Sequence, residues 1–434
     1  MKYFLAGIKG TGMAGLASML CDMGNIVCGY DDATYYTFTE EVLKERNIPI
    51  YEDINNLTSD MIFVYSTALP NDHKAILKAK ELGCQIYYYS QMLGELTKKY
   101  DTICVSGTHG KTTTTSMISK ILDNSIGTNY LIGAGDGKVN KDSNLFVLEA
   151  CEFDRHFLLY DAKYTIITNI ELDHVDSYKN IEETIDAFGK MVDNTKEKVI
   201  ACGDDLNVRK LKSNQIIYYG FNEDNDIVAK NLILKPEGSN FDVYIKGDFI
   251  GHFSLPLYGK HMVLNALASI YISYILGVNP SDILESLKLY QTAKRRYNEE
   301  KIGDVIVVDD YAHHPTEVKT VIEVSRQKYP KKQVVAVLVP HTYSRTKAFY
   351  KDFADVLKLA DKAYVSDVYP ARELKEDYPG VDHTLITNLA PNSEHITPET
   401  IDKLLIHKNA VILFMSGTDP SWLLHPFKDL ISKN

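Results

Sequence analysis

The 434-residue sequence lacks the features of secreted, membrane-spanning and disulfide-stabilised proteins. Its six cysteines form no C-x-x-C pair, and none lies beyond position 202. This pattern fits neither a disulfide framework nor a zinc site, and it is typical of reduced thiols in a cytosol. No apolar run approaches the roughly 18 residues that a membrane span needs, and no signal-peptide cleavage pattern follows the N-terminus. We therefore expect a cytoplasmic protein.

An excess of basic residues is also missing. The chain has 47 Lys and Arg against 58 Asp and Glu, a formal net charge of −11, and no block rich in Lys or Arg. Duplex nucleic acid and anionic membranes are therefore not expected as partners. The sequence has neither an internal repeat nor a low-complexity tract. With 45% hydrophobic and 24% charged residues it has the composition of a globular protein, and its length suggests about three domains.

Hydrophobic periodicity predicts three α/β domains, which we bound at residues 1–98, 99–294 and 295–434. In the first and third domains, short apolar runs alternate with helical patterns, as in a parallel, doubly wound sheet. The second domain also begins with such an alternation, and its expected parallel strands are 102–105, 145–148, 164–168 and 199–201. Residues 216–257 differ, because short alternating runs are separated by Gly, Asn and Pro. We expect a small antiparallel sheet there.

A glycine motif follows the first expected strand. Gly10 to Gly15 has the form G-x-G-x-x-G, and Asp31 and Asp32 come about 20 residues later, which is the spacing typical of dinucleotide sites. Such glycines let the backbone approach a diphosphate at a helix N-terminus. The motif alone allows a dehydrogenase, a protein that binds another nucleotide diphosphate, or a tight turn without a ligand.

A second glycine motif, Ser106 to Thr113, lies between a strand and a helix and has the sequence SGTHGKTT. Its backbone N–H groups would hold phosphates, Lys111 would reach the β- and γ-oxygens, and Thr112 would bind Mg²⁺. It departs from the eight-residue P-loop, because only two residues separate the glycines and position 103 is Ile. A helix opening with four threonines is a poor structural choice, since each Thr costs about 0.5 kcal/mol against Ala. This favours a functional role.

Acidic residues follow two neighbouring expected strands. Glu149 ends one strand, with Glu152 and Asp154 after it, and Asn169 to His174 follows the next. Because the carboxyl ends of parallel strands meet at one edge of a sheet, we expect these groups near the phosphate loop. We predict Glu149 and His174 as metal ligands, with Asp173 orienting the ring of His174. The alternative is that the acidic groups are solvated loop or cap residues.

Polar residues also follow two strands of the third domain, at 309–317 and 340–346. His313 and His314 stand beside two aspartates, but no further His or Cys spacing supports a closed zinc site. We therefore prefer substrate-binding and phosphate-linked roles. At the boundary of the second and third domains, Arg295 and Arg296 would either clamp a phosphate or be solvated.

Taken together, these motifs resemble the Mur ligase family. The resemblance covers nearly the whole chain in order and spacing, and it rests on residues 7–13, 66–68, 149–152, 309–315 and 340–346. It implies an N-terminal Rossmann-like domain for a UDP-sugar, a central P-loop ATPase domain, and a C-terminal Rossmann-like domain for the incoming amino acid. Two segments depart from the family pattern. The first is 415–420, and the second is the short, glycine-containing tract 131–144. We expect the tract 131–144 to be flexible.

The resemblance further implies ATP-dependent ligation of L-alanine to the lactyl carboxylate of UDP-N-acetylmuramate through an acyl phosphate, in peptidoglycan precursor synthesis. A ligase that attaches a tripeptide to the same sugar in cell-wall recycling shares most of the motifs and is the alternative. A nicotinamide-dependent oxidoreductase would leave Lys111, Glu149 and His174 without a role. A non-enzymatic nucleotide-binding protein would show no ATP turnover. The sequence does not give the oligomeric state.

Site residues also follow from the resemblance. It assigns the UDP-sugar to Gly10, Thr11, Gly12, Met13, Asp31, Ser66 and Thr67. It assigns ATP to Gly107, Thr108, His109, Gly110, Lys111, Thr112, Thr113, His261, Asn265, Arg296 and Asp310. It implies two Mg²⁺ ions, one on Thr112 and Glu149 and one on His174. Its catalytic residues are Lys111, His174, His313 and Arg345.

Overall fold

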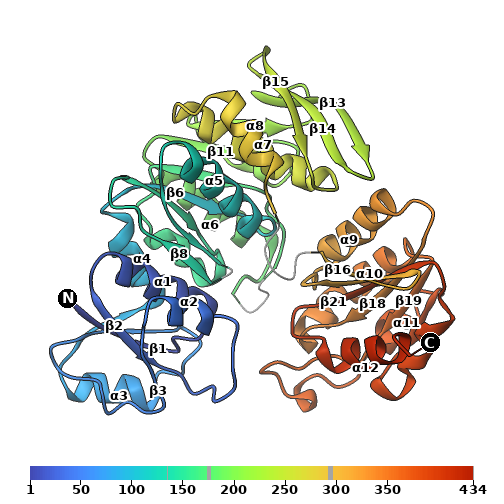
Figure 1. The fold of residues 1–434 in the computed structure, drawn as a ribbon, viewed down its shortest axis with the longest axis horizontal. Coiled ribbons are helices and arrows are strands. Elements are labelled where there is room, and N and C mark those ends of the chain that lie inside the picture. Colours follow the sequence, from blue (N-terminus) through green and yellow to red (C-terminus); the bar gives the residue numbers. More distant parts are fainter. Residues whose placement is uncertain (134, 174–176, 292–296, 434) are drawn as a thin grey trace. The chain divides into compact units, whose positions relative to one another are not determined.

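A computed structural model of the chain describes residues 1–133, 135–173, 177–291 and 297–433. The chain forms two compact units, which we describe separately. The first comprises residues 1–231, 241–253 and 264–290, and the second comprises residues 232–240, 254–263 and 291–434. Three sheets follow one another along the sequence (Figure 1). Among the described residues, no helix combines the length and apolar character that crossing a membrane would require.

The first sheet has five parallel strands in the order β3-β2-β1-β4-β5, as the N-terminal alternation predicted. Its strands are β1 (Lys2–Ala6), β2 (Ile26–Tyr30), β3 (Ile50–Tyr51), β4 (Ile62–Tyr65) and β5 (Gln85–Tyr88). Helices α1 (Thr11–Asp22), α2 (Glu40–Glu45) and α4 (Tyr89–Thr97) pack on one face, and α3 (Lys74–Glu81) packs on the other. Burial on both faces explains the continuous apolar runs of its strands.

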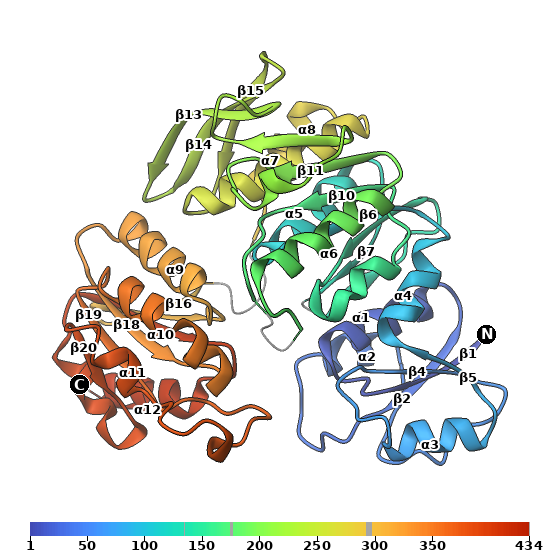
Figure 2. The same cartoon turned by 180° about the vertical axis from the view of Figure 1, so that it is seen from behind.

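The second sheet has ten strands in the order β15-β14-β13-β12-β11-β10-β6-β9-β7-β8. The strands are β6 (Asp101–Ser106), β7 (Asn129–Ile132), β8 (Asp136–Lys138), β9 (Leu145–Glu149), β10 (Tyr164–Ile167), β11 (Lys198–Cys202), β12 (Ile216–Gly220), β13 (Ile227–Lys235), β14 (Gly238–Ile245) and β15 (Asp248–Leu255). Its helices are α5 (Lys111–Ser125), α6 (Ile181–Asn194), α7 (Lys260–Ile275) and α8 (Pro280–Lys288), seen from both sides in Figures 1 and 2.

Two expectations about this sheet were wrong in detail. We expected residues 216–220 in the antiparallel part, but β12 pairs in parallel with β11, because the connection 203–215 is long enough for a crossover. Only β13 to β15, which two-residue turns join, form the meander. We also expected residues 131–144 to be flexible, but β7 and β8 form an antiparallel hairpin there.

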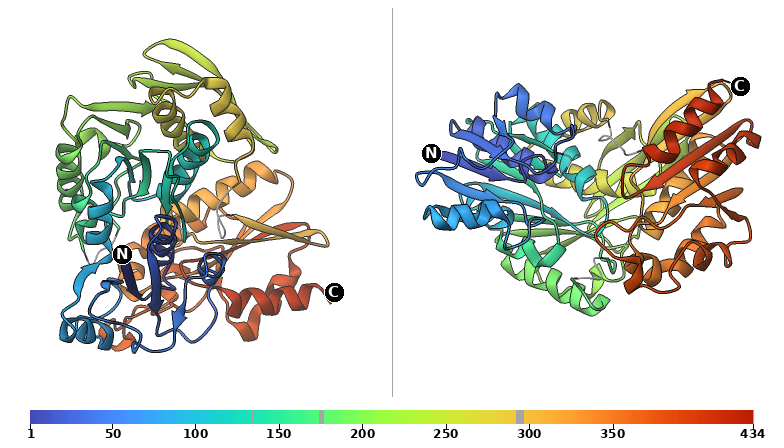
Figure 3. Two further views of the ribbon diagram at one scale, coloured as in Figure 1. Left: turned by 60° about the vertical axis from the view of Figure 1, so that its left-hand side comes forward. Right: turned by 90° about the horizontal axis from the view of Figure 1, so that it is seen from below.

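The third sheet has the order β16-β17-β21-β18-β19-β20. Its strands are β16 (Asn298–Ile302), β17 (Val305–Asp310), β18 (Gln333–Val339), β19 (Lys362–Val365), β20 (Ser393–His395) and β21 (Ala410–Ser416). Helices α9 (Pro315–Lys328), α10 (Tyr343–Leu357) and α11 (Thr384–Thr387) cover one face, and α12 (Ser421–Ile431) and the 3-10 segment Pro398–Ile406 cover the other (Figure 3). The edge strands β16 and β20 are polar, so hydrophobic periodicity missed them.

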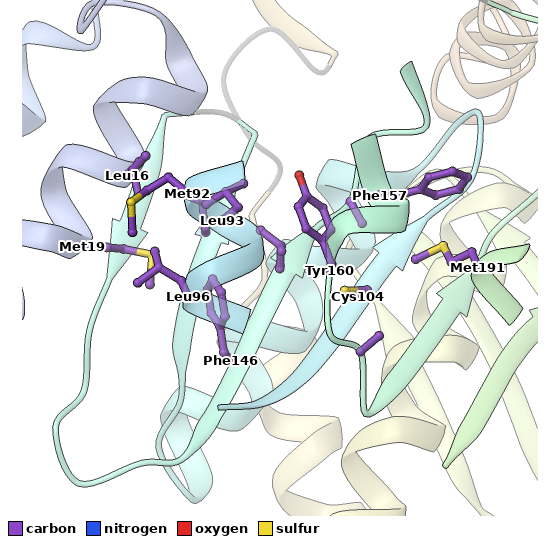
Figure 4. Close-up of a cluster of buried hydrophobic side chains, with 14 of the residues drawn as sticks. Leu16, Met19, Met92, Leu93, Leu96, Cys104, Phe146, Phe157, Tyr160 and Met191 are labelled. Carbon is purple, nitrogen blue, oxygen red and sulfur yellow. The ribbon is translucent and has the colours of Figure 1, made fainter. Parts of the chain in front are cut away.

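Within the first unit, the first two sheets share one hydrophobic core. Leu16 and Met19 of α1 and Leu93 of α4 belong to the same buried cluster as Cys104 and Phe146 of the second sheet (Figure 4). The helix α1 also lies directly against the β7–β8 hairpin. Residues 1–98 are therefore joined to the second sheet by apolar packing as well as by the chain.

Candidate active site

The first glycine loop turns from β1 into α1. The N–H of Lys9 donates to Asp31 Oδ2 at 2.8 Å, and the N–H of Ala33 donates to Asp31 Oδ1 at 2.9 Å. Asp31, a predicted UDP-sugar residue, thus holds the glycine loop through Oδ2 and its own turn through Oδ1. The side chain of Met13 is buried in the core, so only its backbone can face a ligand. Gly10 precedes α1 in extended conformation, and Thr11 begins the helix.

Ser66 and Thr67, also predicted for this site, follow β4 beside the loop. The N–H of Ser66 donates to the carbonyl of Ala6 at the end of β1. A Cβ on Gly7, whose φ is +78°, would lie 2.9 Å from Ser66 Cβ, so the loop and the end of β4 touch here. Thr67 is exposed. The structure therefore brings the predicted UDP-sugar residues to one edge of the first sheet.

The second glycine loop requires its glycines for steric reasons. Gly107 has φ +132°, and a Cβ there would lie 2.0 Å from Thr168 Oγ1. Gly110 has φ +84° at the N-cap of α5, and its Cβ would lie 2.8 Å from Asn265 Oδ1. Asn265, a predicted ATP residue on α7, is thus in contact with the loop. Both positions therefore require glycine, and the N–H groups from Gly110 onward lie at the N-terminus of α5, where a phosphate can bind.

The residues after β10 hold this loop in place. Asn169 Oδ1 accepts the N–H of His109 at 2.8 Å, and Asn169 Nδ2 donates to the carbonyl of His109 at 2.9 Å. The hydroxyl of Thr168 donates to the same carbonyl at 2.6 Å. Thr108 exchanges two hydrogen bonds with the backbone of Glu171. The sequence analysis predicted Thr108 and His109 as ATP-binding residues. It did not predict that Thr168 and Asn169 set the conformation of their loop.

Lys111 is the first residue of α5 and is held by a buried acid. Its Nζ lies 2.9 Å from Glu152 Oε2 and donates to the carbonyls of Gly107 at 2.6 Å and Thr108 at 3.0 Å. Glu152 is 2% exposed. Burial alone would lower the pKa of Lys111, but Glu152 and other acidic neighbours raise it above its usual value. Lys111 is therefore a buried cation aimed at its own phosphate loop.

Thr112 and Glu149 meet beside this lysine. The hydroxyl of Thr112 donates to Glu149 Oε1 at 3.1 Å, and the N–H of Gly133 donates to Glu149 Oε2 at 2.8 Å. A hydroxyl and a carboxylate are hard oxygen ligands of the kind that Mg²⁺ prefers, so this donor set fits the predicted ion. His174, predicted for a second ion, lies outside the described residues, as does Arg296.

A pocket of about 220 Å³ in the first unit extends from the first glycine loop to Glu149, the partner of Thr112. It is lined by Thr11, Gly12, Tyr89, Leu131, Gly133, Glu149, Cys151, His156 and Tyr160. Burial raises the pKa of Tyr89 and Tyr160, so these two hydroxyls are neutral near pH 7. Glu149 is the acidic side chain of this lining.

His156 reaches the pocket from the 3-10 segment Phe153–Leu159, which contains strained backbone. Asp154 and Arg155 have φ values of +50° and +56°, in the left-handed region that non-glycine residues rarely adopt. The hydroxyl of Tyr178 anchors the segment by donating to the carbonyl of Glu152 at 2.6 Å. Burial lowers the pKa of His156, so its ring is neutral near pH 7. Sequence reasoning missed both His156 and Tyr89, because neither belongs to a glycine or acidic motif.

The predicted residues of the second unit lie at the carboxyl ends of β17, β18 and β21. The ring of His313 lies 5.8 Å from that of His341, and a Cβ on Gly417 would lie 2.9 Å from His313 Cγ. Arg345 stands in the first turn of α10, after Thr342, whose φ is +65°. The structure thus gathers His313 with His341 and the 415–420 segment, which the sequence treated as separate features.

Asp310 and His261, two predicted ATP residues, also belong to the second unit. Asp310 is 6% exposed, and its carboxylate accepts the N–H groups of Tyr297 at 2.7 Å and Ala312 at 2.8 Å. It therefore shapes the turn after β17. His261 is the second residue of α7, beside Gly259.

Comparison with known families identifies the chain. Residues 3–101 match the catalytic-domain model of the Mur ligase family, residues 105–273 match the Mur ligase middle domain, and residues 295–416 match the glutamate ligase domain of Mur ligases. The chain belongs to the Mur ligase family. This confirms the resemblance inferred from the glycine loops, and it replaces the dehydrogenase interpretation of Gly10 to Gly15.

Solved structures share the fold of this Mur ligase. A UDP-N-acetylmuramate–alanine ligase from Thermotoga maritima has 24% identity and a TM-score of 0.81, over 100% of this chain and 99% of that chain. A UDP-N-acetylmuramate:L-alanyl-γ-D-glutamyl-meso-diaminopimelate ligase from Neisseria meningitides has 25% identity and a TM-score of 0.61, over 68% and 99%. A MurF ligase from Thermotoga maritima, solved with ADP, has 18% identity and a TM-score of 0.64, over 88% and 97%. The α/β fold class is thereby confirmed.

Proposed function

We propose that this Mur ligase joins L-alanine to the lactyl carboxylate of UDP-N-acetylmuramate in the cytoplasm, using ATP and forming ADP, phosphate and an amide. The observation that carries the proposal is the pocket in which Thr11 and Gly12 of the first loop and Glu149 beside the second loop line one cavity. A UDP-sugar with its diphosphate at the first loop would extend its lactyl group toward the second. Because Glu149 accepts a hydrogen bond from Thr112 at the second loop, this arrangement supports a substrate that bridges a diphosphate site and a phosphoryl donor.

The first chemical step brings two anions together, because the lactyl carboxylate attacks the γ-phosphate of ATP. Lys111 at the start of α5 would offset this repulsion and stabilise the charge on the transferring group. To do so, its Nζ must exchange the carbonyls of Gly107 and Thr108 for phosphate oxygens, while Glu152 keeps it charged. The backbone N–H groups at Gly110 and beyond would receive the remaining phosphate oxygens.

For Mg²⁺, we propose Thr112 and Glu149 as ligands of one ion and His174 as a ligand of a second. The bound ion would supply charge neutralisation at the phosphate oxygens. The N–H of Gly133 orients Glu149, and Thr112 lies within hydrogen-bond distance of it, so the two oxygens are preorganised by the protein.

The amine of L-alanine then attacks the acyl phosphate, and phosphate leaves. We propose that His313 and Arg345 contact the amino acid and the reacting carboxylate, and that His261, Asn265, Arg296 and Asp310 contact ATP. We also propose that the chain is divided into three domains, at residues 1–98, 99–294 and 295–434.

Phosphate release from ATP tests the reaction. With Mg²⁺ and UDP-N-acetylmuramate, we expect release only when L-alanine is added, and mass spectrometry of the product identifies the amide. The tripeptide L-Ala-γ-D-Glu-meso-diaminopimelate is the comparison substrate, because the tripeptide ligase matches this chain with about the same sequence identity as the alanine ligase does. If phosphate is released with the tripeptide but not with L-alanine, the tripeptide is the substrate. Absence of turnover with both would contradict the ligase proposal.

A further inference from the structure

Two histidines and an aspartate that the reaction does not use come together in the second unit. Asp367 follows β19, His395 is the last residue of β20, and His383 directly precedes α11. His395 pairs with Val365 across the two parallel strands. Three separate segments thus converge at the carboxyl end of β19 and β20.

The geometry of this cluster is tight. Asp367 Oδ1 lies 3.0 Å from His395 Nε2, and the rings of His383 and His395 are stacked, with centroids 3.7 Å apart and an interplanar angle of 7°. One ligand atom from each of the three residues lies within 4.8 Å of the other two. Asp367 is 71% exposed on its side chain, so an ion in solution has access to the cluster.

The ring of His383 has no hydrogen bond among the described residues, and its Nδ1 is fully buried without a partner. An unpaired buried nitrogen is destabilising, so a ligand for this ring would recover free energy. An imidazole nitrogen binds a metal ion through its lone pair, so a metal ion would give this ring the partner that it lacks.

We propose that Asp367, His383 and His395 form a binding site for one divalent transition-metal ion, with Zn²⁺ as its probe. Two imidazoles and one carboxylate suit Zn²⁺ and its neighbours, whereas Mg²⁺ and Ca²⁺ prefer oxygen ligands alone. Zinc–nitrogen bonds of about 2.0–2.1 Å place tetrahedral ligands roughly 3.4 Å apart. Because imidazole lone pairs lie in the ring planes, the two stacked rings would have to turn out of the stack to point at one ion, and a water would complete the shell.

Binding would fix the connection between β19 and β20. Val368 and Val381 of this connection pack on Tyr343, the first residue of α10. Arg345 follows two residues later on the same helix. A metal at the cluster would therefore stiffen the segment that supports the start of α10. The metal site itself does not depend on the proposed function.

Isothermal titration of Zn²⁺ into the chelator-treated, full-length protein tests the site, with Mg²⁺ in excess to fill oxygen-ligand sites. We expect one equivalent to bind to the wild type. His383→Gln, His395→Gln and Asp367→Asn should each weaken binding at least roughly tenfold, as loss of a ligand does. His252→Gln is the matched control, because His252 is an exposed histidine paired with an aspartate, Asp242, in the other unit.

His383→Gln is the decisive variant, since its ring has no hydrogen bond to lose and the substitution should leave the fold intact. In EDTA its thermal unfolding should match that of the wild type, and Zn²⁺ should raise the midpoint of the wild type only. A wild type that binds no Zn²⁺ would overturn the site, and so would a loss of Zn²⁺ binding in the His252→Gln control, which keeps all three proposed ligands. So would Zn²⁺ binding that all three variants retain unchanged.

Discussion

Replacing Lys111 with Ala should affect stability as well as catalysis. The Nζ of Lys111 lies 2.9 Å and 3.2 Å from the two carboxylate oxygens of Glu152, which is 2% exposed. Removing one partner of a buried ion pair leaves the other charge uncompensated, at a cost of about 3–5 kcal/mol. We expect Lys111→Ala to lose about 3 kcal/mol, because a water in the vacated volume would partly solvate the carboxylate.

A small set of variants separates the two effects. Chemical unfolding should show that Lys111→Ala, combined with Glu152→Gln, recovers most of the lost stability, since a neutral amide needs no cation. Phosphate release should fall at least about 100-fold in both the single and the double variant. Lys190→Ala is the control, because Lys190 and Asp186 form an exposed pair on α6 that is worth less than about 1 kcal/mol.

Two outcomes would refute this reasoning. If the single variant unfolds within about 0.5 kcal/mol of the wild type, Glu152 is not an uncompensated buried charge, because exposed sites alone tolerate such changes. If its turnover is close to normal, Lys111 does not stabilise the transferring phosphoryl group.

Three further predictions concern the first unit. Gly137→Ala should destabilise this unit by about 1–3 kcal/mol, because the new Cβ would lie 2.3 Å from the carbonyl oxygen of Gly15. Gly189→Ala, in open space on α6, should stabilise it by about 0.5–1 kcal/mol. Equal unfolding midpoints for the two variants would contradict both predictions. The wild type should lose stability as the pH falls below about 6.5, because the pKa of His156 is lowered in the folded protein and the unfolded chain therefore takes up a proton more readily. His156→Gln should reduce this loss. Parallel curves of unfolding free energy against pH for the two proteins would contradict the prediction. Glu149→Gln should raise the Mg²⁺ needed for half-maximal phosphate release roughly tenfold or more, and an unchanged titration would remove Glu149 from the ligands.

The sequence was sufficient for features that arise from local patterns. Strands buried on both faces are continuous apolar runs, so β6, β9 and β10, expected at 102–105, 145–148 and 164–168, were predicted to within one residue at each end. The polar edge strand β16 buries almost none of its side chains, and its pairing depends on a distant neighbour, β17. Hydrophobic periodicity contains no information on such a strand.

The candidate site shows the same division. Lys111, Thr112 and Glu149 belong to motifs whose chemistry is visible in the residue types, and the structure places them in contact. Tyr89 and His156 line the same pocket, but they owe their position to the start of α4 and to a strained segment. Their role depends on packing between elements far apart in sequence, which no spacing rule reveals.

The packing of α1 on the β7–β8 hairpin has a consequence for dividing the chain. The third glycine of the first motif, Gly15, is in van der Waals contact with this hairpin, through Leu131 and Gly137. A fragment that ends at residue 98 would expose the apolar side of α1 and α4 to water, and we expect it to aggregate. Exchange of N-terminal segments between related ligases would therefore succeed only if residues 129–138 are transferred with them.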